Sequence, residues 1–317
     1  MTGHRLLAKR IRPVLLRRYF PWFERNGQFS PFKLATLVLL CLPALWVFYE
    51  YWTQTLGPKP GIAAVREVGS WGVRFLIVSL AITPLRFATG WSKFLLVRRM
   101  IGLAALAYLL AHFALYMLDQ QFDLIKIATE IVLRFYLTIG FVALLGMIAL
   151  GATSKDSIIK RMGGANWSRL HALVYPIAGL GLLHFFLQAK IEIYEPTLLT
   201  GLFFMLMADR QLRKRGAPKL GWKAPAFVAL AGIASALAIA LFEAAWRYFR
   251  NDIDPLRVLA ADFDFSYSIA PNWWVLLGGL GLAAVVALRV KGWLALPGGK
   301  KAPARDRSAG QSAAPAR

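Results

Sequence analysis

The sequence predicts an all-α polytopic membrane protein, a bundle of about eight transmembrane helices. Three observations support this fold class. Hydrophobic residues make up 58% of the 317 residues and charged residues only 17%. Apolar runs near the ~20-residue length of a membrane span recur along the whole chain. Basic and acidic residues also alternate between successive connections, as they do in multi-pass proteins.

The chain can be divided in order. Residues 1–31 are basic with interspersed apolar residues, which predicts a cytoplasmic arm lying on the anionic leaflet. Residues 32–209 form a six-helix core, 210–291 add two helices, and 292–317 have the composition of a disordered cytoplasmic tail. The eight predicted spans are 32–51, 71–88, 100–118, 132–152, 169–188, 195–209, 225–246 and 273–290.

The charged residues predict the orientation of these spans. Connections 86–99, 153–169 and 209–223 are basic, whereas the intervening ones carry acidic residues. The positive-inside rule then places both termini in the cytoplasm. The net charge of +22 therefore indicates topology and contact with membrane lipids, not nucleic acid. Cys41 is the only cysteine, which excludes structural disulfides, iron–sulfur clusters and cysteine zinc sites.

Three of the four histidines lie inside predicted spans, where an ionisable ring is costly and usually marks a site. His112 falls in the outer half of the third span. His171 and His184 lie on the fifth span, ~20 Å apart along a helix axis, with His184 toward the outer face. Two imidazoles at one depth on different helices, His112 and His184, suit axial ligation of a haem iron. His4 lies in the arm, where we expect it to be solvated.

The set of possible haem ligands at the inner depth, near His171, is less complete than the set at the outer depth. The residues of the third span at the depth of His171 are Arg98 and Arg99, and neither is a normal axial ligand. Either a second haem has one histidine there with another group opposite, or His171 has another role. An ideal helix would point His171 and His184 about 140° apart. A bend at Pro176 could aim both rings at a common neighbour.

Several arginines fit supporting roles. Arg74 lies at about the depth of the outer histidines, where it could pair with haem propionates. Arg98, Arg99 and Arg169 surround the inner position and could hold propionates or a flavin phosphate. Snorkelling to the membrane interface explains any single one of them equally well.

Intramembrane histidines can also be proton relays or packing residues, so a haem-free transporter or scaffold is an alternative. The matched depths and the scarcity of intramembrane carboxylates favour haem. No stretch has the strand–helix alternation and glycine-rich turn of a nicotinamide-binding module. Electrons must therefore come from a separate cytoplasmic flavin reductase or a membrane quinol, and leave to another protein or small oxidant.

Five stretches of the core carry a family pattern. They are ITPLR (82–86), RRMIGL (98–103), LAHFALY (110–116), RFYLTIG (134–140) and NWSRLHALVYPIAGLGLLHF (166–185). With them the chain resembles the haem-binding membrane subunit of the periplasmic methionine sulfoxide reductase system. This is the MsrQ (YedZ) family, within the ferric-reductase-like transmembrane superfamily. The resemblance covers 32–209 and includes His112, His171 and His184, whereas the last two spans depart from the six-span family core.

The resemblance implies haem b, one or two per chain, and it allows FMN as a second cofactor. It also implies a bacterial inner-membrane location and electron delivery to a periplasmic molybdopterin-containing subunit that reduces methionine sulfoxide in proteins. The chain would then be an electron-transfer subunit, with the catalytic reductase on a separate chain. The nearest alternative is a ferric-chelate reductase or a superoxide-generating oxidase, which normally has a fused cytoplasmic flavoprotein.

Overall fold

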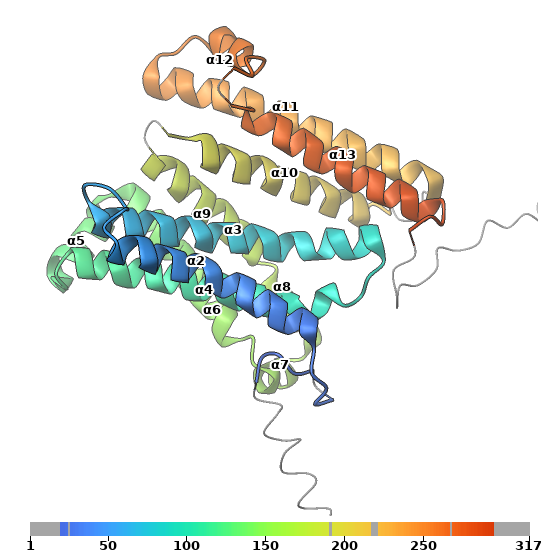
Figure 1. Ribbon diagram of the computed structural model, residues 1–317, viewed down its shortest axis with the longest axis horizontal. Helices are drawn as coiled ribbons and strands as arrows, with labels where there is room; N and C mark the ends of the chain where they lie inside the picture. Colours follow the sequence, from blue (N-terminus) through green and yellow to red (C-terminus); the bar gives the residue numbers. More distant parts are fainter. Residues whose placement is uncertain (1–19, 25, 190–191, 217–220, 267, 295–317) are drawn as a thin grey trace, which may run out of the picture. The chain divides into compact units, whose positions relative to one another are not determined.

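The computed structural model describes residues 20–24, 26–189, 192–216, 221–266 and 268–294 (Figure 1). These residues form helices, and their only strand-like feature is a single bridge between Phe23 and Phe29. The all-α prediction is therefore confirmed. Most of the predicted N-terminal arm and C-terminal tail lies outside the described residues.

Seven of the eight predicted spans are confirmed as helical segments long and apolar enough to cross a membrane. This makes the chain a multi-pass membrane protein. The segments are α2 (Pro31–Trp52), α3 (Pro60–Thr89), α4 (Phe94–Asp119), α6 (Phe135–Ala152), α8 (Gly164–His171) with α9 (Val174–Ala189), α11 (Ala224–Asn251) and α13 (Pro271–Val290).

The predicted span at 195–209 is the exception. It forms the helix α10 (Tyr194–Lys214), but α10 is not among the seven segments. Glu195 stands at its start, and Asp209, Arg210, Arg213 and Lys214 stand at its end. Its uncharged stretch covers only ~20 Å of helix axis, which is shorter than the hydrocarbon core of ~30 Å.

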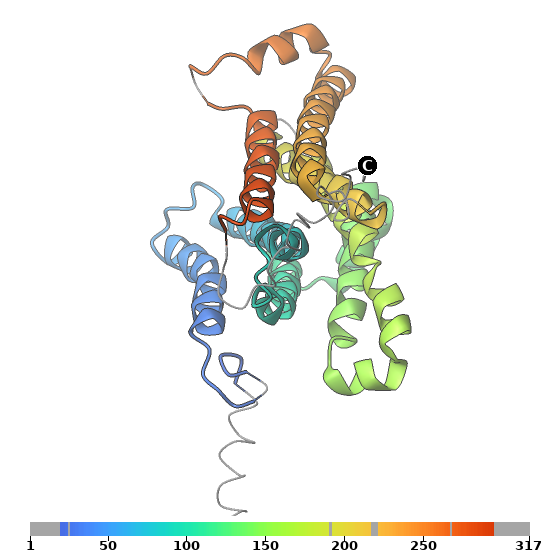
Figure 2. The same ribbon diagram turned by 90° about the vertical axis from the view of Figure 1, so that its right-hand side faces the viewer.

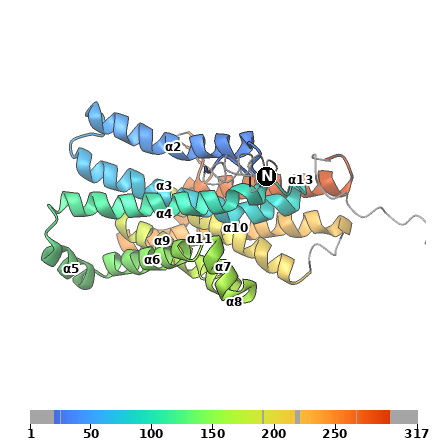
Figure 3. The same cartoon turned by 90° about the horizontal axis from the view of Figure 1, so that it is seen from below.

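Three short helices occupy connections that the sequence reading left without secondary structure. They are α5 (Leu124–Leu133), α7 (Asp156–Met162) and α12 (Pro255–Ala261). Asp123 caps α5 by accepting from the Lys126 amide at 3.0 Å, and α5 lies where α4 ends and α6 begins (Figure 3). Gly163 adopts φ +78° between α7 and α8, a conformation that glycine reaches without steric cost.

The contacts divide the chain into two compact units. Unit 1 comprises Met1–Ile82 and Leu95–Phe203, and unit 2 comprises Thr83–Phe94 and Phe204–Arg317. In unit 1, the Tyr108 hydroxyl of α4 enters the hydrogen-bond ladder of α2. It donates to the Leu40 carbonyl and accepts from the Ala44 amide, both at 2.8 Å. The insertion lies beside Pro43, which has no amide proton, and it fixes α4 against α2.

In unit 2, α11 and α13 pack directly on each other, and α12 lies at one end of the pair (Figure 2). Their closest approach is at Gly232 and Gly279. A Cβ atom built on Gly232 would lie 2.7 Å from the Gly279 Cα, and one built on Gly279 would lie 2.4 Å from the Gly232 Cα. Only glycine at both positions allows backbones to approach this closely.

Candidate functional site

His112 lies on α4, two turns before the helix ends. Its Nδ1 is 2.7 Å from the backbone oxygen of Val65 on α3. A carbonyl oxygen can only accept a hydrogen bond, so this contact requires Nδ1 to carry the proton. The other ring nitrogen, Nε2, then keeps its lone pair available for a metal.

His184 on α9 repeats this arrangement with a different neighbour. Its Nδ1 is 2.7 Å from the backbone oxygen of Tyr136 on α6. Its Nε2 therefore also keeps a free lone pair. A hydrogen bond from the second ring nitrogen to a carbonyl is the usual way in which a metal-binding histidine is oriented.

The two imidazoles lie together within unit 1. Their ring centroids are 6.5 Å apart, and their planes make an angle of 78°. Metal–imidazole bonds are about 2 Å long and the ring centre lies about 1 Å behind the nitrogen, so two rings on one metal have centres about 6 Å apart. The observed separation fits a metal held between His112 and His184.

The remaining donors restrict which metal could bind. Among the described residues, no group of three or more His, Cys, Asp or Glu side chains could hold a metal ion. Two imidazoles alone suit a metal that brings its other ligands with it. Haem iron has four equatorial bonds to its porphyrin and needs only axial ligands from the protein. The residues present therefore fit a haem.

The helical segment that carries His171 and His184 is interrupted between these two residues. Helix α8 ends at His171 and α9 begins at Val174, with Pro176 in its first turn. Proline lacks the amide proton needed to continue the first helix and would clash with the preceding turn. After this break both rings contact the same neighbour, because His184 reaches the start of α6 and His171 reaches its end.

His171 has different partners from the other two histidines. Its Nε2 is 3.1 Å from the hydroxyl of Thr153, the residue that follows α6. Trp167 stacks on its ring with centroids 4.1 Å apart and donates its indole N–H to the Thr153 carbonyl at 3.1 Å. The structure thus pairs His112 with His184 and places no second described histidine beside His171.

Two of the four predicted arginines, Arg74 and Arg99, pair with carboxylates. Arg74 donates through Nε to Glu195 at 2.5 Å and lies over the Trp71 ring at 4.4 Å. Arg99 pairs with Asp156 of α7 at 2.5 Å. Arg98 is within electrostatic range of the His171 ring, and Arg169 is exposed on α8.

Sequence reasoning missed the carbonyls of Val65 and Tyr136 and the partner of Arg74. A main-chain carbonyl has no signature in a sequence, so no pattern could have singled out the first two. Val65 also lies before the predicted start of its span at residue 71. Glu195 could have been singled out from the sequence, because a carboxylate at the end of an apolar run is usually paired with a nearby cation.

Unit 2 contains a separate charged cluster. Arg247 donates to Glu243 at 2.8 Å, and Asn272 donates to Asp262 at 3.0 Å. Burial, reinforced by the negative charge of Glu243 and opposed by Arg247, raises the pKa of Asp262 to about 6. The Asn272 bond joins the end of α12 to α13, and the cluster includes no predicted site residue.

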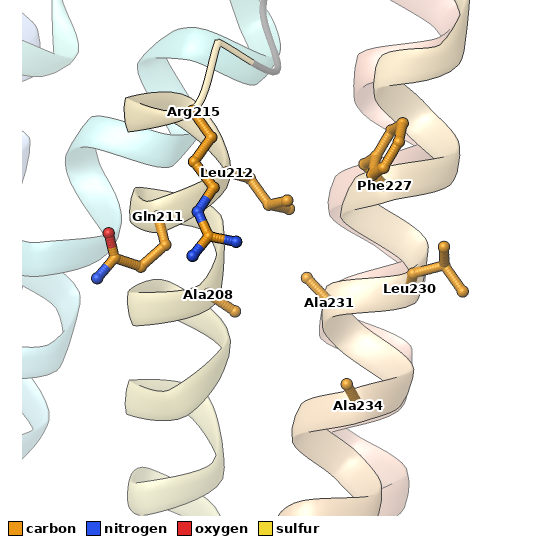
Figure 4. A pocket seen from close by; sticks show the side chains of 8 residues that line it. All are labelled: Ala208, Gln211, Leu212, Arg215, Phe227, Leu230, Ala231 and Ala234. Atoms are coloured by element: carbon orange, nitrogen blue, oxygen red, sulfur yellow. The ribbon is translucent and has the colours of Figure 1, made fainter.

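A groove of about 260 Å³ lies between α10 and α11 in unit 2 (Figure 4). Its walls are apolar apart from Gln211 and Arg215, and the Arg215 side chain runs along α10 in the figure. None of the described residues that line it is a histidine. It therefore offers no ligand to a haem iron.

Comparison with known proteins agrees with this geometry. Residues 68–182, which include His112 and His171 and end two residues before His184, match the family model of the ferric reductase like transmembrane component. No solved structure matches the chain.

Curated relatives match over a longer range. All three described here are named as the heme-binding subunit MsrQ of protein-methionine-sulfoxide reductase. The Rhodospirillum rubrum protein is 41% identical over 179 residues, 56% of this chain and 86% of the relative. The Polaromonas naphthalenivorans protein is 44% identical, over 49% of this chain and 72% of the relative. The Azospira oryzae protein is 36% identical, over 59% and 81% respectively. The chain therefore belongs to the MsrQ family of ferric-reductase-like membrane proteins.

Proposed function

We propose that this chain is the haem b electron-transfer subunit of a methionine sulfoxide reductase system. It passes electrons across the bacterial inner membrane to a periplasmic molybdopterin-containing subunit, which reduces methionine sulfoxide in oxidised proteins. The observation that carries the proposal is the pair formed by His112 and His184. Their rings lie 6.5 Å apart, and each Nδ1 is hydrogen-bonded to a carbonyl. The names of the relatives as heme-binding subunits support it.

His112 and His184 would hold the haem through their Nε2 atoms. When bound, haem supplies one-electron transfer. Because His112 and His184 would both be engaged in holding the haem, neither histidine would be available to a sulfoxide. Reduction of the substrate then belongs to a separate chain, and this chain supplies the electrons.

Electron entry would lie at the end marked by His171. Its Nε2 is engaged by Thr153 at 3.1 Å, so ligation of a second haem requires that hydrogen bond to be exchanged for iron. Arg98, Arg99 and Arg169 provide positive charge suited to a propionate or to the phosphate of FMN. A cytoplasmic flavin reductase or a membrane quinol would be the donor.

The domain organisation follows from the same assignment. Residues 32–209 would form the electron-transfer core, and the helices of 210–291 would lie outside it. The matches to relatives support this division, since the three described above cover between 49% and 59% of the chain. The basic connections support a cytoplasmic position for the His171 end.

Haem content tests the first part of the proposal. The purified protein should show a Soret band and, after reduction, an α-band, and the pyridine haemochrome should give one or two haem b per chain. A preparation that contains no haem when expressed with an adequate haem supply would contradict the proposal and favour a transporter or scaffold.

Periplasmic repair tests the second part. Deleting the gene for this chain should lower reduction of methionine sulfoxide in periplasmic proteins, and a plasmid copy should restore it. The His112→Ala variant, expressed at the same level, serves as the control for the presence of the protein without its haem site. Unchanged repair in the deletion strain, with haem present in the protein, would favour the oxidase or ferric-chelate reductase alternative.

A further inference from the structure

The two haem-ligand histidines are held by one repeated backbone arrangement. Each accepting carbonyl is followed four residues later by a glycine on the same helix. Gly69 follows Val65 in α3, and Gly140 follows Tyr136 in α6. The two halves of the site come from different helix pairs, α3 with α4 and α6 with α9, and yet they use the same spacing.

Each glycine lies directly against the ring that it faces. A Cβ atom built on Gly69 would be 2.6 Å from Nδ1 of His112 and 3.0 Å from its Cε1. A Cβ atom built on Gly140 would be 2.6 Å from Nδ1 of His184 and 2.7 Å from its Cε1. These distances are far below a van der Waals contact, so any side chain at either position would push the imidazole away.

The spacing of four residues has a physical reason. In an α-helix the Cα–Cβ bond tilts toward the N-terminus, so a side chain covers the turn that precedes it. The residue four positions after a carbonyl is therefore placed to shield that carbonyl from outside groups. With glycine at this position, the carbonyl can accept from an imidazole N–H as well as from its own helix.

We propose that Gly69 and Gly140 are positioning residues for the haem ligands. By leaving the Val65 and Tyr136 carbonyls uncovered, they fix the ring orientation and the Nδ1–H tautomer of His112 and His184. The inference rests on the proposed function, because it assigns these histidines to the iron. Loss of the groups that orient a metal ligand typically lowers metal affinity 10–100-fold.

Two other glycines provide matched controls on the same helices. A Cβ on Gly72 of α3 would meet Leu109 Cδ2 at 2.7 Å, and one on Gly146 of α6 would meet Ile177 Cδ1 at 2.7 Å. These positions are as crowded as Gly69 and Gly140, but they face apolar side chains. Comparing Gly69→Ala with Gly72→Ala, and Gly140→Ala with Gly146→Ala, separates ligand positioning from helix packing.

The variants are compared by haem retention and by redox titration in detergent. Gly69→Ala and Gly140→Ala should lose haem about 10–100-fold more readily than wild type. Their reduction potential should rise, because an imidazole without its hydrogen bond is a weaker donor to ferric iron. Each tenfold loss of ferric over ferrous affinity corresponds to about 59 mV. Gly72→Ala and Gly146→Ala should keep the wild-type spectrum and potential.

A second modification tests the same hydrogen bond without adding a side-chain atom. It keeps the inference testable if the alanine variants do not fold. Replacing Leu137 by its α-hydroxy acid turns the Tyr136 carbonyl into an ester, which is a weaker acceptor. The potential should again rise. The same replacement at Ile148, which lies on α6 away from the histidine contact, should not change it.

The outcomes distinguish this inference from the proposed function. If the histidine-facing and control glycine variants behave alike, and the ester leaves the potential unchanged, the glycines serve packing only and the inference is overturned. If haem is absent from wild type, or remains complete in His112→Ala and His184→Ala, the proposed function fails and takes the inference with it.

Discussion

In unit 1 two glycines lie against imidazole rings, whereas in unit 2 two glycines lie against each other. Gly69 and Gly140 leave space that His112 and His184 fill. Gly232 and Gly279 leave space that the opposing helix backbone fills. The same residue type therefore admits polar side chains in one unit and close helix association in the other. Filling the space beside the two imidazoles should alter the haem, whereas filling the glycine crossing of unit 2 should alter stability alone.

The largest effect should come from the ligands themselves. His112→Ala or His184→Ala removes one haem ligand, and haem affinity should fall by more than the roughly 10–100-fold expected for loss of an orienting group. His171→Ala should keep the spectrum of the outer haem, because its ring contacts Thr153 and Trp167 instead. Absorption spectra of membranes with equal protein content measure this. Full haem content in both ligand variants would remove the basis of the comparison.

Crowding the glycine crossing of unit 2 should destabilise the protein without removing haem. Gly232→Ala forces a methyl group against the Gly279 backbone, and overpacking of this kind costs about 1–3 kcal/mol. Gly281→Ala is the control, since a Cβ there meets nothing within 4 Å. Thermal unfolding in detergent should show a lower midpoint for Gly232→Ala only. Haem loss from folded Gly232→Ala would break the distinction between the units.

A smaller effect is expected from the ion pair of Arg74 and Glu195 in unit 1. Removing the positive charge with Arg74→Gln should lower the haem potential, because a nearby cation stabilises the reduced form. Glu195→Gln should raise it. A unit charge at about 15 Å with an effective dielectric constant near 20 contributes on the order of 1 kcal/mol. Potentiometric titration checks both signs, and shifts in one direction for both variants would contradict the assignment.

The smallest effect should be a pH dependence in unit 2. The pKa of Asp262 is raised from 3.8 to about 6 by burial and by Glu243. The folded state therefore binds this proton more tightly, and stability should fall as the pH rises from about 4 to about 6. Asp262→Asn should abolish this slope, which solvent screening at this partly buried carboxyl should keep below about 1 kcal/mol. Unfolding midpoints at several pH values measure it.

Asp264 provides the control for that experiment. It is exposed, and hydrogen bonds from Ser266 lower its pKa. Its contribution to stability is present at higher pH and is lost only as the pH falls through its own lowered pKa. Asp264→Asn should therefore leave the slope between pH 4 and 6 unchanged, and a flattened slope in this variant would refute the role of Asp262.

The sequence predicted the membrane spans well where the signal was local. An apolar run of span length can be recognised from the sequence alone, so α2 and α13 begin and end within a few residues of their predicted limits. The same holds for the end of α4 and the start of α11, whereas α4 begins earlier and α11 ends later than predicted. Helix α3 begins eleven residues before its predicted start, because Arg66 and Glu67 interrupt the apolar pattern. In the structure Arg66 is exposed and Glu67 is half-buried, so the helix continues through both charges where the apolar pattern stops.

The site was predictable only in part. Matching depths brought His112 and His184 together before any coordinates, since depth depends on position along a span. The atoms that orient them belong to the backbone of other helices. The glycines that expose those atoms cannot be told from Gly102, Gly179 or Gly181, which face open space. Which glycine faces a histidine depends on how the helices are rotated against each other.

The use of main-chain oxygens as anchors has a genetic consequence. No codon encodes a carbonyl, so no missense change at Val65 or Tyr136 can delete the group that holds its histidine. Missense variation should therefore be tolerated at these two positions as far as the helix is preserved. The vulnerable codons are those of Gly69 and Gly140. A single nucleotide change in either codon is enough to introduce a side chain.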